Sequence, residues 1–192
     1  SVYGVNLPPA LLADIAAIQR NSQHLAKLVD DVLDLSQIES GRMAINKEWT
    51  SMPEIVNQSV SAVQALYASK NLYLKTELPD DLHFVYCDST RIRQVLINLL
   101  SNAGRFTEQG GVIVKLTREE GMIQIGVADT GLGIAPEDQK RLFEPFYQVD
   151  SSLRRSYGGS GLGLHISKQF VEMHQGKMWL ESKVGVGTTF YL

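Results

Sequence analysis

The N-terminal part of the chain restricts its fold most strongly, because residues 8 to about 40 contain no glycine and place apolar side chains at helical spacing. The apolar residues follow a heptad: Leu11, Ile18, Leu25 and Val32 lie seven apart, and Leu28 and Leu35 take the alternate position. This pattern predicts one long helix with a narrow apolar stripe. One helix cannot bury such a stripe alone, so we expect it to pack either on its own domain or against partner helices.

After Gly41 the pattern changes to short extended runs that alternate with helices, which is typical of a layered α+β domain. We expect strands at residues 42–49, 72–78, 83–87, 111–118, 122–128, 177–182 and 188–192. We expect helices at residues 52–69, 136–143 and 163–174, and another that begins at Asp88 or Ser89 and reaches about Phe106. The chain is therefore predicted to comprise an N-terminal region, 1–41, and a larger domain, 42–192.

Composition excludes several classes of protein. The 192 residues carry 18 Lys and Arg against 21 Asp and Glu, a net charge of −3, so the basic excess typical of a nucleic-acid-binding protein is absent. The only cysteine, Cys87, rules out disulfides within the chain and cysteine-based metal sites. No apolar run approaches the roughly 20 residues of a membrane span. We expect a cytoplasmic domain with no nucleic-acid partner, whose parent protein can be anchored through other segments.

Glycine is distributed very unevenly, since 14 of the 16 glycines fall at or after Gly104 and many of them occur in pairs. Glycine accepts positive φ and lets main-chain N–H groups approach an anion. The pairs therefore indicate backbone that lies close to a ligand.

The first candidate motif runs from Asn98 to Thr107, on the helix that begins near Asp88. At about 100° per residue, one face of this helix is apolar and predicted to be core: Ile92, Val95, Leu96, Leu99 and Ala103. Asn98, Asn102 and Arg105 share the adjacent face, with Phe106 at its border. Two amides and a guanidinium beside an aromatic ring suit a metal–phosphate group and its attached base, although an ordinary solvated helix face has the same pattern.

Two further motifs are rich in glycine. Residues 129–134 follow a predicted strand, so Asp129 can present a carboxylate to a donor such as the exocyclic amine of adenine, or simply cap a tight turn. Residues 158–164 lead into a helix, which suits a phosphate at the helix N-terminus or a flexible hinge. A Rossmann site is excluded because these glycines do not follow the first strand of a βαβ unit, and a P-loop because no Gly-Lys-Ser/Thr follows them.

The order and spacing of these motifs resemble the ATP-binding catalytic half of a sensor histidine kinase, in the superfamily that includes gyrase B, Hsp90 and MutL ATPases. Residues 98–107 resemble the N box, 129–134 the G1 box, 143–146 the F box, 158–164 the G2 box and 185–190 the closing glycine-rich turn and strand. Upstream, residues 25–43 resemble the second helix of the dimerisation and histidine-phosphotransfer hairpin, which favours the partner-helix interpretation of the heptad. The resemblance implies a two-layer α/β sandwich of the Bergerat type, with a mixed, mainly antiparallel sheet covered on one face by helices.

The resemblance also implies roles for individual residues, with ATP and Mg²⁺ as ligands. Asn98 and Asn102 would hold Mg²⁺, Arg105 would contact phosphate, Phe106 would lie near adenine, and Asp129 would accept from the adenine amine. Ile134, Phe143 and Leu164 would form apolar walls of the ATP site. Residues 148–157 are predicted to form a lid, in which Arg154 and Arg155 are candidate phosphate contacts. The remaining expected ATP contacts are Gly131, Gly133, Gly159, Gly161, Leu162, Gly163 and Thr188. Arg105 stands where the family often has Lys, and Ser160 where Thr is common.

The acceptor motif of the family, His-Glu/Asp-x-x-Thr/Asn-Pro, is absent from this sequence, and residues 1–7 resemble the hairpin loop that follows the acceptor helix. None of the four histidines, His24, His83, His165 and His174, lies in a suitable context. The chain is therefore expected to bind ATP without phosphorylating itself. The implied partners are the phosphoacceptor helix of the same protein, a second copy in a homodimer, and the receiver domain of a response regulator, whose aspartate accepts the phosphoryl group.

Two alternatives to a histidine kinase remain at this point: a nucleotide-binding regulatory module without kinase activity, and a mechanical ATPase of the gyrase or Hsp90 type. Those ATPases place a Glu, which activates water, where this chain has Asn98. An amide cannot take a proton from water, so steady ATP hydrolysis should be slow.

Overall fold

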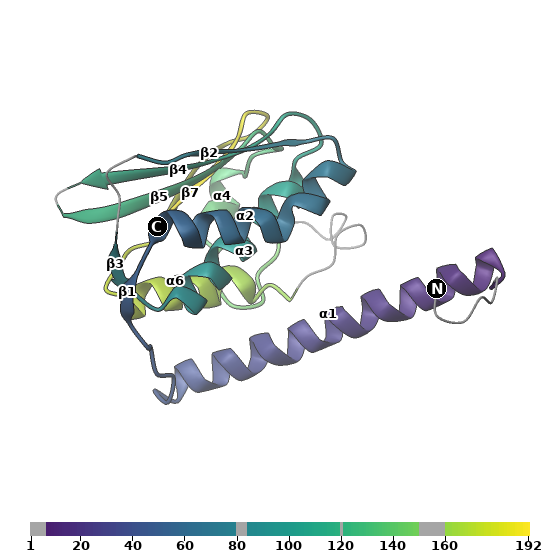
Figure 1. Cartoon of the computed structure of the whole chain (residues 1–192), viewed down its shortest axis with the longest axis horizontal. Coiled ribbons are helices and arrows are strands. Elements are labelled where there is room, and N and C mark those ends of the chain that lie inside the picture. The colour runs from purple at the N-terminus through teal and green to yellow at the C-terminus, as the bar shows by residue number, and fades with distance from the viewer. Residues whose placement is uncertain (1–6, 80–83, 120, 150–159) are drawn as a thin grey trace. The chain divides into compact units, whose positions relative to one another are not determined.

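A computed structural model describes residues 7–79, 84–119, 121–149 and 160–192 of the chain. The chain divides into two compact units, Ser1–Arg42 and Met43–Leu192 (Figure 1). The first unit contains one long helix and the second contains the sheets and the other helices.

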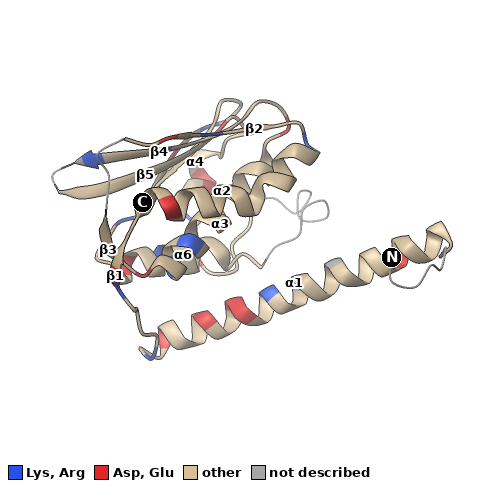
Figure 2. Ribbon diagram, in the orientation of Figure 1, with Lys and Arg blue, Asp and Glu red and all other residues tan. Residues whose placement is uncertain are grey.

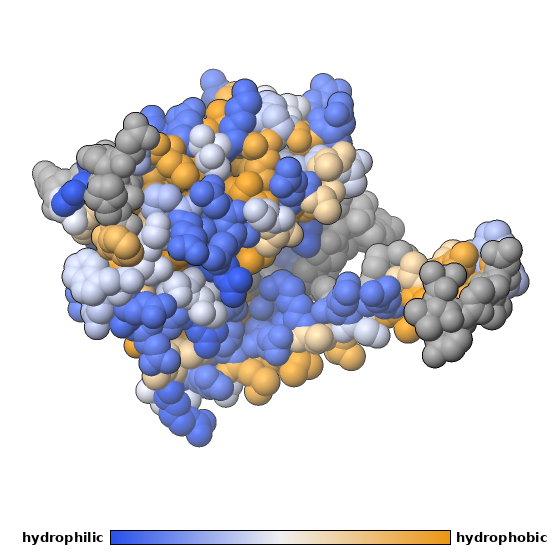
Figure 3. Space-filling view, in the orientation of Figure 1, coloured by the Kyte–Doolittle hydropathy of each residue, from blue (hydrophilic) through white to orange (hydrophobic). Residues whose placement is uncertain are grey.

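Helix α1, Pro9–Glu39, confirms the long helix predicted from the heptad. Pro9 suits the first turn, where its missing N–H costs no hydrogen bond, and Gly41 ends the helix with a φ of 65°. Four residues of the heptad stripe, Leu11, Ile18, Leu25 and Val32, are between 43% and 65% exposed, and apolar side chains are visible along α1 in Figure 3. Acidic residues gather toward the C-terminal end of α1 (Figure 2). Neither α1 nor any other described helix has the length and hydropathy of a membrane span.

The second unit is built on a five-stranded sheet with the order β2-β4-β5-β7-β6. Its strands are β2 Tyr73–Glu77, β4 Gly111–Glu119, β5 Met122–Asp129, β6 Trp179–Lys183 and β7 Gly187–Tyr191. Only the β2–β4 pair is parallel, and the other three pairs are antiparallel. Strands β1, Glu48–Thr50, and β3, Val85–Cys87, form a separate antiparallel pair.

Three helices cover one face of the large sheet (Figure 1): α2 Met52–Ser69, α3 Ser89–Phe106 and α6 Gly163–Met173. Helix α4, Pro136–Gln139, is a single turn in the loop that follows β5. The predicted core face of α3 is at most 5% exposed at every position, as are Val112, Val114 and Leu116 of β4 and Ile125 and Val127 of β5. The predicted two-layer α+β sandwich with a mixed, mainly antiparallel sheet is confirmed.

Helix α3, which carries the N box, is held at its start by a cap and near its C-terminus by packing against α2. Asp88 caps it, because Oδ1 accepts the Arg91 N–H at 3.0 Å. Near its C-terminus, the buried Tyr67 hydroxyl of α2 donates to Leu100 O at 2.7 Å. Gly104 faces the same ring, where an added Cβ would lie 2.9 Å from Tyr67 Cε2. A side chain at position 104 would therefore force α2 and α3 apart.

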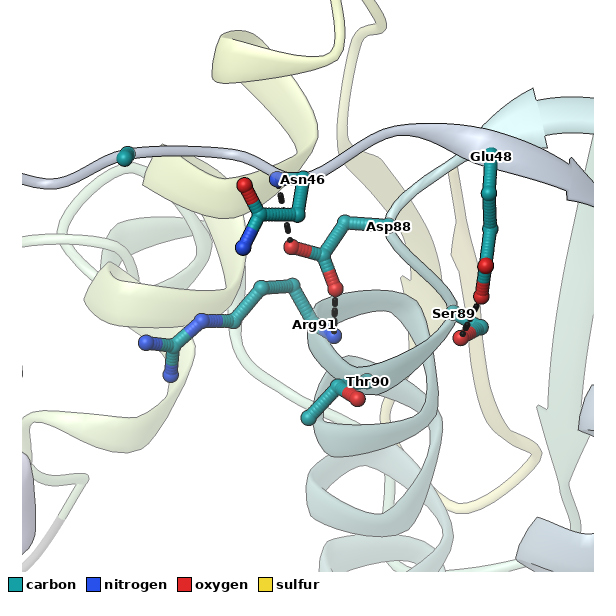
Figure 4. A pocket seen from close by; sticks show the side chains of 7 residues that line it. Asn46, Glu48, Asp88, Ser89, Thr90 and Arg91 are labelled. Carbon is teal, nitrogen blue, oxygen red and sulfur yellow. Dashed lines mark hydrogen bonds between the residues drawn. The ribbon is translucent and has the colours of Figure 1, made fainter.

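Two predicted elements are shorter than expected. The strand predicted at 42–49 begins only at Glu48, because the preceding residues bond to the start of α3 instead of a strand. The Asn46 N–H donates to Asp88 Oδ2 at 3.0 Å (Figure 4), and Arg91 Nη2 lies 3.4 Å from Met43 Sδ. The helix predicted at 136–143 ends at Gln139, where the chain continues in tight turns and the Gln139 amide donates to the Ile134 and Ser182 carbonyls.

Candidate functional site

Helix α3 connects the two ends of the candidate site. Asn98 lies beside the first residue of α6, since an added Cβ on Gly163 would be 2.6 Å from Asn98 Oδ1. Phe106 lies beside the turn after β5, since an added Cβ on Gly131 would be 2.7 Å from Phe106 O. These two points are about 12 Å apart along the helix axis. A ligand with a base at one end and phosphates at the other can lie along this stripe.

The carboxylate of Asp129 is held through only one of its oxygens. Asp129 is the last residue of β5 and pairs with Thr188 of β7. Its Oδ1 accepts two backbone N–H groups, from Gly131 at 2.8 Å and from Thr188 at 3.2 Å. Within the described residues, Oδ2 has no hydrogen-bond donor. The carboxylate is thus rigidly oriented, with one oxygen available for a donor on a ligand.

Burial raises the pKa of the Asp129 carboxyl, and the N–H groups of Gly131 and Thr188 partly offset this effect. Burial also raises the pKa of the nearby Tyr67 hydroxyl, and the negative charge of Asp129 raises it further. An ionised carboxylate that lacks full solvation gains from a ligand that donates a hydrogen bond. An exocyclic amine is such a donor.

A serine that was not identified from the sequence joins the strands behind Asp129. Ser182 Oγ accepts the Ile134 N–H at 2.8 Å and lies 2.8 Å from the hydroxyl of Thr188, which is 5% exposed. Ser182 also donates to Gly187 O at 3.1 Å. Gly187 has a φ of 134°, and an added Cβ would collide with Asp129 O. Ser182 and Gly187 therefore hold the end of β7 against the end of β5.

The C-terminal end of α3 is held by a lysine that the sequence analysis also missed. Lys70 Nζ donates to three carbonyl oxygens at this end, those of Gly104, Arg105 and Thr107, at 2.9, 2.8 and 3.2 Å. A cation here satisfies carbonyls that have no partner inside the helix and interacts favourably with the helix dipole. Only the position of Lys70, just after the last residue of α2, hinted at this contact.

The polar stripe of α3 keeps its predicted side chains near the same surface. Asn98, Asn102 and Arg105 are half-buried, and Phe106 is 38% exposed. Asn102 makes no side-chain hydrogen bond to other described residues. Burial lowers the pKa of the Arg105 guanidinium, because partial desolvation disfavours the cation. An anionic ligand would offset this cost.

The G2 residues begin α6. Leu162 precedes this helix without a side-chain cap. Among the described residues, no side chain therefore caps the first N–H groups of α6, which are of the kind that bind an anion. Gly161, with a φ of 70°, packs against the backbone of Phe146, whose N–H donates to Gly161 O at 3.0 Å. The F box and the G2 box are therefore in contact.

The three predicted apolar walls, Ile134, Phe143 and Leu164, are half-buried. Gly133 has a φ of 69° and lies so close to Lys183 O that any side chain would collide with it. Arg154, Arg155 and Gly159, and most of the predicted lid, lie outside the described residues.

His165 and His174 each make hydrogen-bond contacts to the backbone. His165 Nδ1 lies 2.9 Å from Phe143 O. His174 Nε2 accepts the Asp88 N–H at 2.9 Å, which leaves Nδ1 to donate to Phe170 O at 2.7 Å. Each ring is committed to a backbone partner, as expected of a structural histidine.

The side chains along α3 that could bind a cation are amides. No group of three His, Cys, Asp or Glu side chains that could hold a metal ion occurs among the described residues. The amide oxygens of Asn98 and Asn102 are oxygen ligands of the kind that Mg²⁺ accepts, and Mg²⁺ commonly binds through few protein ligands together with substrate phosphates. The residues present therefore fit a cation that arrives with the nucleotide.

A polar cavity lies at the opposite end of α3 (Figure 4). It has a volume of about 380 Å³ and is lined by residues that include Asn46, Glu48, Asp88 and Arg91. Asp88 precedes Asn98 by about 15 Å along the helix axis. The cavity is thus separate from the stripe that carries the motifs.

Residues 87–192 match the family model described as histidine kinase-, DNA gyrase B-, and HSP90-like ATPase. The chain belongs to this family. Two of its relatives are named as histidine kinases. The circadian input-output histidine kinase CikA of Synechococcus elongatus is 44% identical over 179 residues, which cover 92% of this chain and 24% of CikA. The sensor histidine kinase WalK of Bacillus subtilis is 33% identical over 174 residues, 89% of this chain and 28% of WalK.

Solved structures of histidine kinases share the fold of this ATPase domain. Full-length ShkA in complex with AMPPNP has a TM-score of 0.84 at 27% identity, over 97% of this chain and 39% of ShkA. The histidine kinase AdeS of Acinetobacter baumannii has a TM-score of 0.78 at 26% identity, over 100% of this chain and 88% of AdeS. The chain thus contains the ATP-binding catalytic domain of a sensor histidine kinase, and it spans about a quarter of the length of CikA and WalK.

Proposed function

We propose that residues 42–192 bind ATP with Mg²⁺ and transfer its γ-phosphoryl group to a histidine on a helix outside this chain. The observation that carries the proposal is the carboxylate of Asp129, fixed through Oδ1 by two N–H groups with Oδ2 left for a ligand. Membership of the ATPase family and the likeness to ShkA, solved with AMPPNP, support ATP as that ligand.

The proposed nucleotide lies along α3. Its adenine amine donates to Asp129 Oδ2, and Phe106 contacts the base. Arg105 and the first turn of α6 bind the phosphates, while Asn98 and Asn102 hold the cation, which neutralises charge on the phosphate oxygens. Ile134, Phe143 and Leu164 line the apolar side of the nucleotide site. The glycines of the G1 and G2 boxes, Leu162 and Thr188 let the backbone lie close to the nucleotide. Arg154 and Arg155 are proposed as further phosphate contacts.

The proposed reaction depends on positioning more than on acid–base chemistry by this domain. The bond between the γ-phosphorus and the bridging oxygen breaks, a bond forms from phosphorus to an imidazole nitrogen of the acceptor, and ADP leaves as the imidazole loses its proton. Water is a poor competitor, because Asn98 offers an amide, which cannot accept a proton from water. Transfer to histidine is therefore favoured over hydrolysis.

Residues 1–41 are proposed to be the second helix of the dimerisation hairpin. The exposed heptad residues of α1, Leu11, Ile18, Leu25 and Val32, would pack on the acceptor helix and on a second copy as a four-helix bundle. The proposal extends to a cytoplasmic homodimer whose phosphoryl group passes to the receiver domain of a response regulator.

The experiment is incubation of the chain with γ-labelled ATP, with and without a separate hairpin polypeptide that carries the family's acceptor histidine. Label should appear only on the added hairpin, and it should be acid-labile and base-stable, as phosphohistidine is. A hairpin whose acceptor histidine is replaced by alanine is the matched control. Acid-labile label on the chain alone, or label on the alanine hairpin, would contradict the proposal.

A further inference from the structure

Ser167, on α6, makes a contact that its own helix does not require. Its hydroxyl is buried, with the residue 3% exposed, and it accepts the Asn98 Nδ2 group of α3 at 3.0 Å. The fully buried Ser59 of α2 shows the usual alternative, because its hydroxyl donates to Ile55 O of the same helix at 2.7 Å. Ser167 therefore links α6 to α3, about one turn after the first residue of α6.

The other side of the Asn98 amide faces Gly163. An added Cβ on Gly163 would lie 2.6 Å from Asn98 Oδ1, 3.1 Å from Cγ and 3.2 Å from Nδ2, so the amide occupies the space that a side chain would need, with its oxygen nearest. Gly163 is the first residue of α6, where N–H groups without helical partners and the helix dipole favour an oxygen over an NH₂ group. The hydroxyl of Ser167 can accept from an amide NH₂ group or donate to an amide oxygen, so its contact fixes where the Asn98 amide lies. The first turn of α6 then selects which end of the amide is which, with the oxygen toward its N–H groups and the nitrogen toward Ser167.

We infer that Ser167 is a positioning residue for metal-dependent nucleotide binding, which acts by holding the Asn98 amide with its oxygen toward the phosphate end of the site. The inference rests on the proposed function, in which Asn98 is a ligand of the nucleotide-bound Mg²⁺. A flipped amide would present two N–H groups to the cation, and a freely rotating amide would have to be ordered on binding. The hydrogen bond to Ser167 orders the amide in advance, and the first turn of α6 disfavours the flipped form.

The test compares the wild-type chain with Ser167→Ala by calorimetric titration of AMPPNP at a series of MgCl₂ concentrations, and of ADP in EDTA. In Ser167→Ala, the Mg²⁺ concentration that gives half of the maximal gain in AMPPNP affinity should rise about fivefold, which corresponds to about 1 kcal/mol. The affinity for ADP in EDTA should not change. Ser167→Cys, which replaces the hydroxyl by a slightly larger and weaker acceptor, should give an intermediate shift.

A double-mutant cycle shows whether Ser167 acts through Asn98. In the Asn98→Ala background, the added Ser167→Ala change should leave the Mg²⁺ dependence as it is in Asn98→Ala alone. Ser59→Ala is the matched control for loss of a buried helix hydroxyl, and thermal unfolding of every variant establishes that it is folded. A shift of equal size in Ser59→Ala, an undiminished shift in the Asn98→Ala background, or no shift in Ser167→Ala would overturn the inference. Wild-type chain that binds neither nucleotide would instead refute the proposed function.

Discussion

Replacement of Lys70 by methionine tests how the N box is held in place. Lys70 Nζ donates to the carbonyl oxygens of Gly104, Arg105 and Thr107, at 2.8 to 3.2 Å. Lys70→Met keeps most of the aliphatic stem and removes only the cation. The three carbonyls at the end of α3 then lose their common donor, directly beside Arg105 and Phe106.

The expected cost follows from these contacts. Hydrogen bonds to a charged group contribute about 1.5–3 kcal/mol, and Lys70 is half-buried, so water can replace part of what is lost. We therefore expect the free energy of unfolding to fall by about 2 kcal/mol, and the melting temperature by roughly 4–8 °C for a domain of this size. ADP affinity should fall as well, because the last turn of α3 positions Arg105 and Phe106.

The assay is urea unfolding, with ADP titration of the folded protein as the second measurement. The midpoint should shift without a change in the slope of the free energy against urea, which reports the surface exposed on unfolding. Lys115→Met, at an exposed position of β4, is the matched control and should change stability by less than about 0.5 kcal/mol. If Lys70→Met were no less stable than Lys115→Met, the three hydrogen bonds would not hold the end of α3.

Three further predictions concern single residues of the ATPase domain. Because burial raises the pKa of Asp129, its carboxyl is protonated at a higher pH than an ordinary aspartate. ADP affinity should therefore weaken as the pH falls, beginning at a higher pH than the titration of an ordinary aspartate would give, and Asp129→Asn should flatten this dependence. Asn102→Ala should weaken Mg²⁺-dependent ATP binding but leave the melting temperature within about 2 °C, since no core volume is lost; a large loss of stability with unchanged Mg²⁺-dependent affinity would make Asn102 structural. Burial raises the pKa of Cys87 to about 11, so its thiol should react with iodoacetamide at pH 8 only in the unfolded chain, and rapid reaction of the native protein would contradict this environment.

Helix α3 shows what local sequence pattern is able to predict. Its bounds and its buried face depend on residues within one or two turns and were predicted correctly, and the structure selects Asp88 from the two candidate caps, Asp88 and Ser89. The polar stripe also followed from helical geometry alone. Gly104 is required because the Tyr67 ring of another helix leaves no space for a side chain there, and no local sequence pattern contains this contact.

The side chains missed from the sequence act across elements. Lys70, Ser167 and Ser182 each contact a segment between 34 and 69 positions away. Their spacing carries no period or motif, because each contact depends on how two elements pack. The shortened β1 has the same cause, since Asn46 bonds to Asp88, which lies 42 positions away, instead of continuing the strand.

The glycine motifs were predicted to bring backbone close to a ligand, and the structure shows that they also bring backbone close to backbone. Gly133 and Gly187 each lie against a carbonyl oxygen where a Cβ would collide with it. Gly131 and Gly163 lie so close to Phe106 O and to the Asn98 amide, at the two ends of the α3 stripe, that an added Cβ would meet them. The ligand contacts themselves stay predictions.

Titration of ADP into Asp129→Asn tests the central claim most directly. An asparagine keeps an oxygen that can accept the Gly131 and Thr188 N–H groups, so the turn is preserved, but the second oxygen becomes an NH₂ group that repels the adenine amine. Calorimetry should show at least a tenfold loss of affinity, about 1.4 kcal/mol, with the variant folded as judged by thermal unfolding. A GDP titration is the control, because guanine presents a carbonyl oxygen where adenine has its amine, and Asp129→Asn should not weaken it. ADP affinity equal to that of the wild-type chain would contradict adenine recognition by Asp129 and, with it, the placement of the nucleotide along α3.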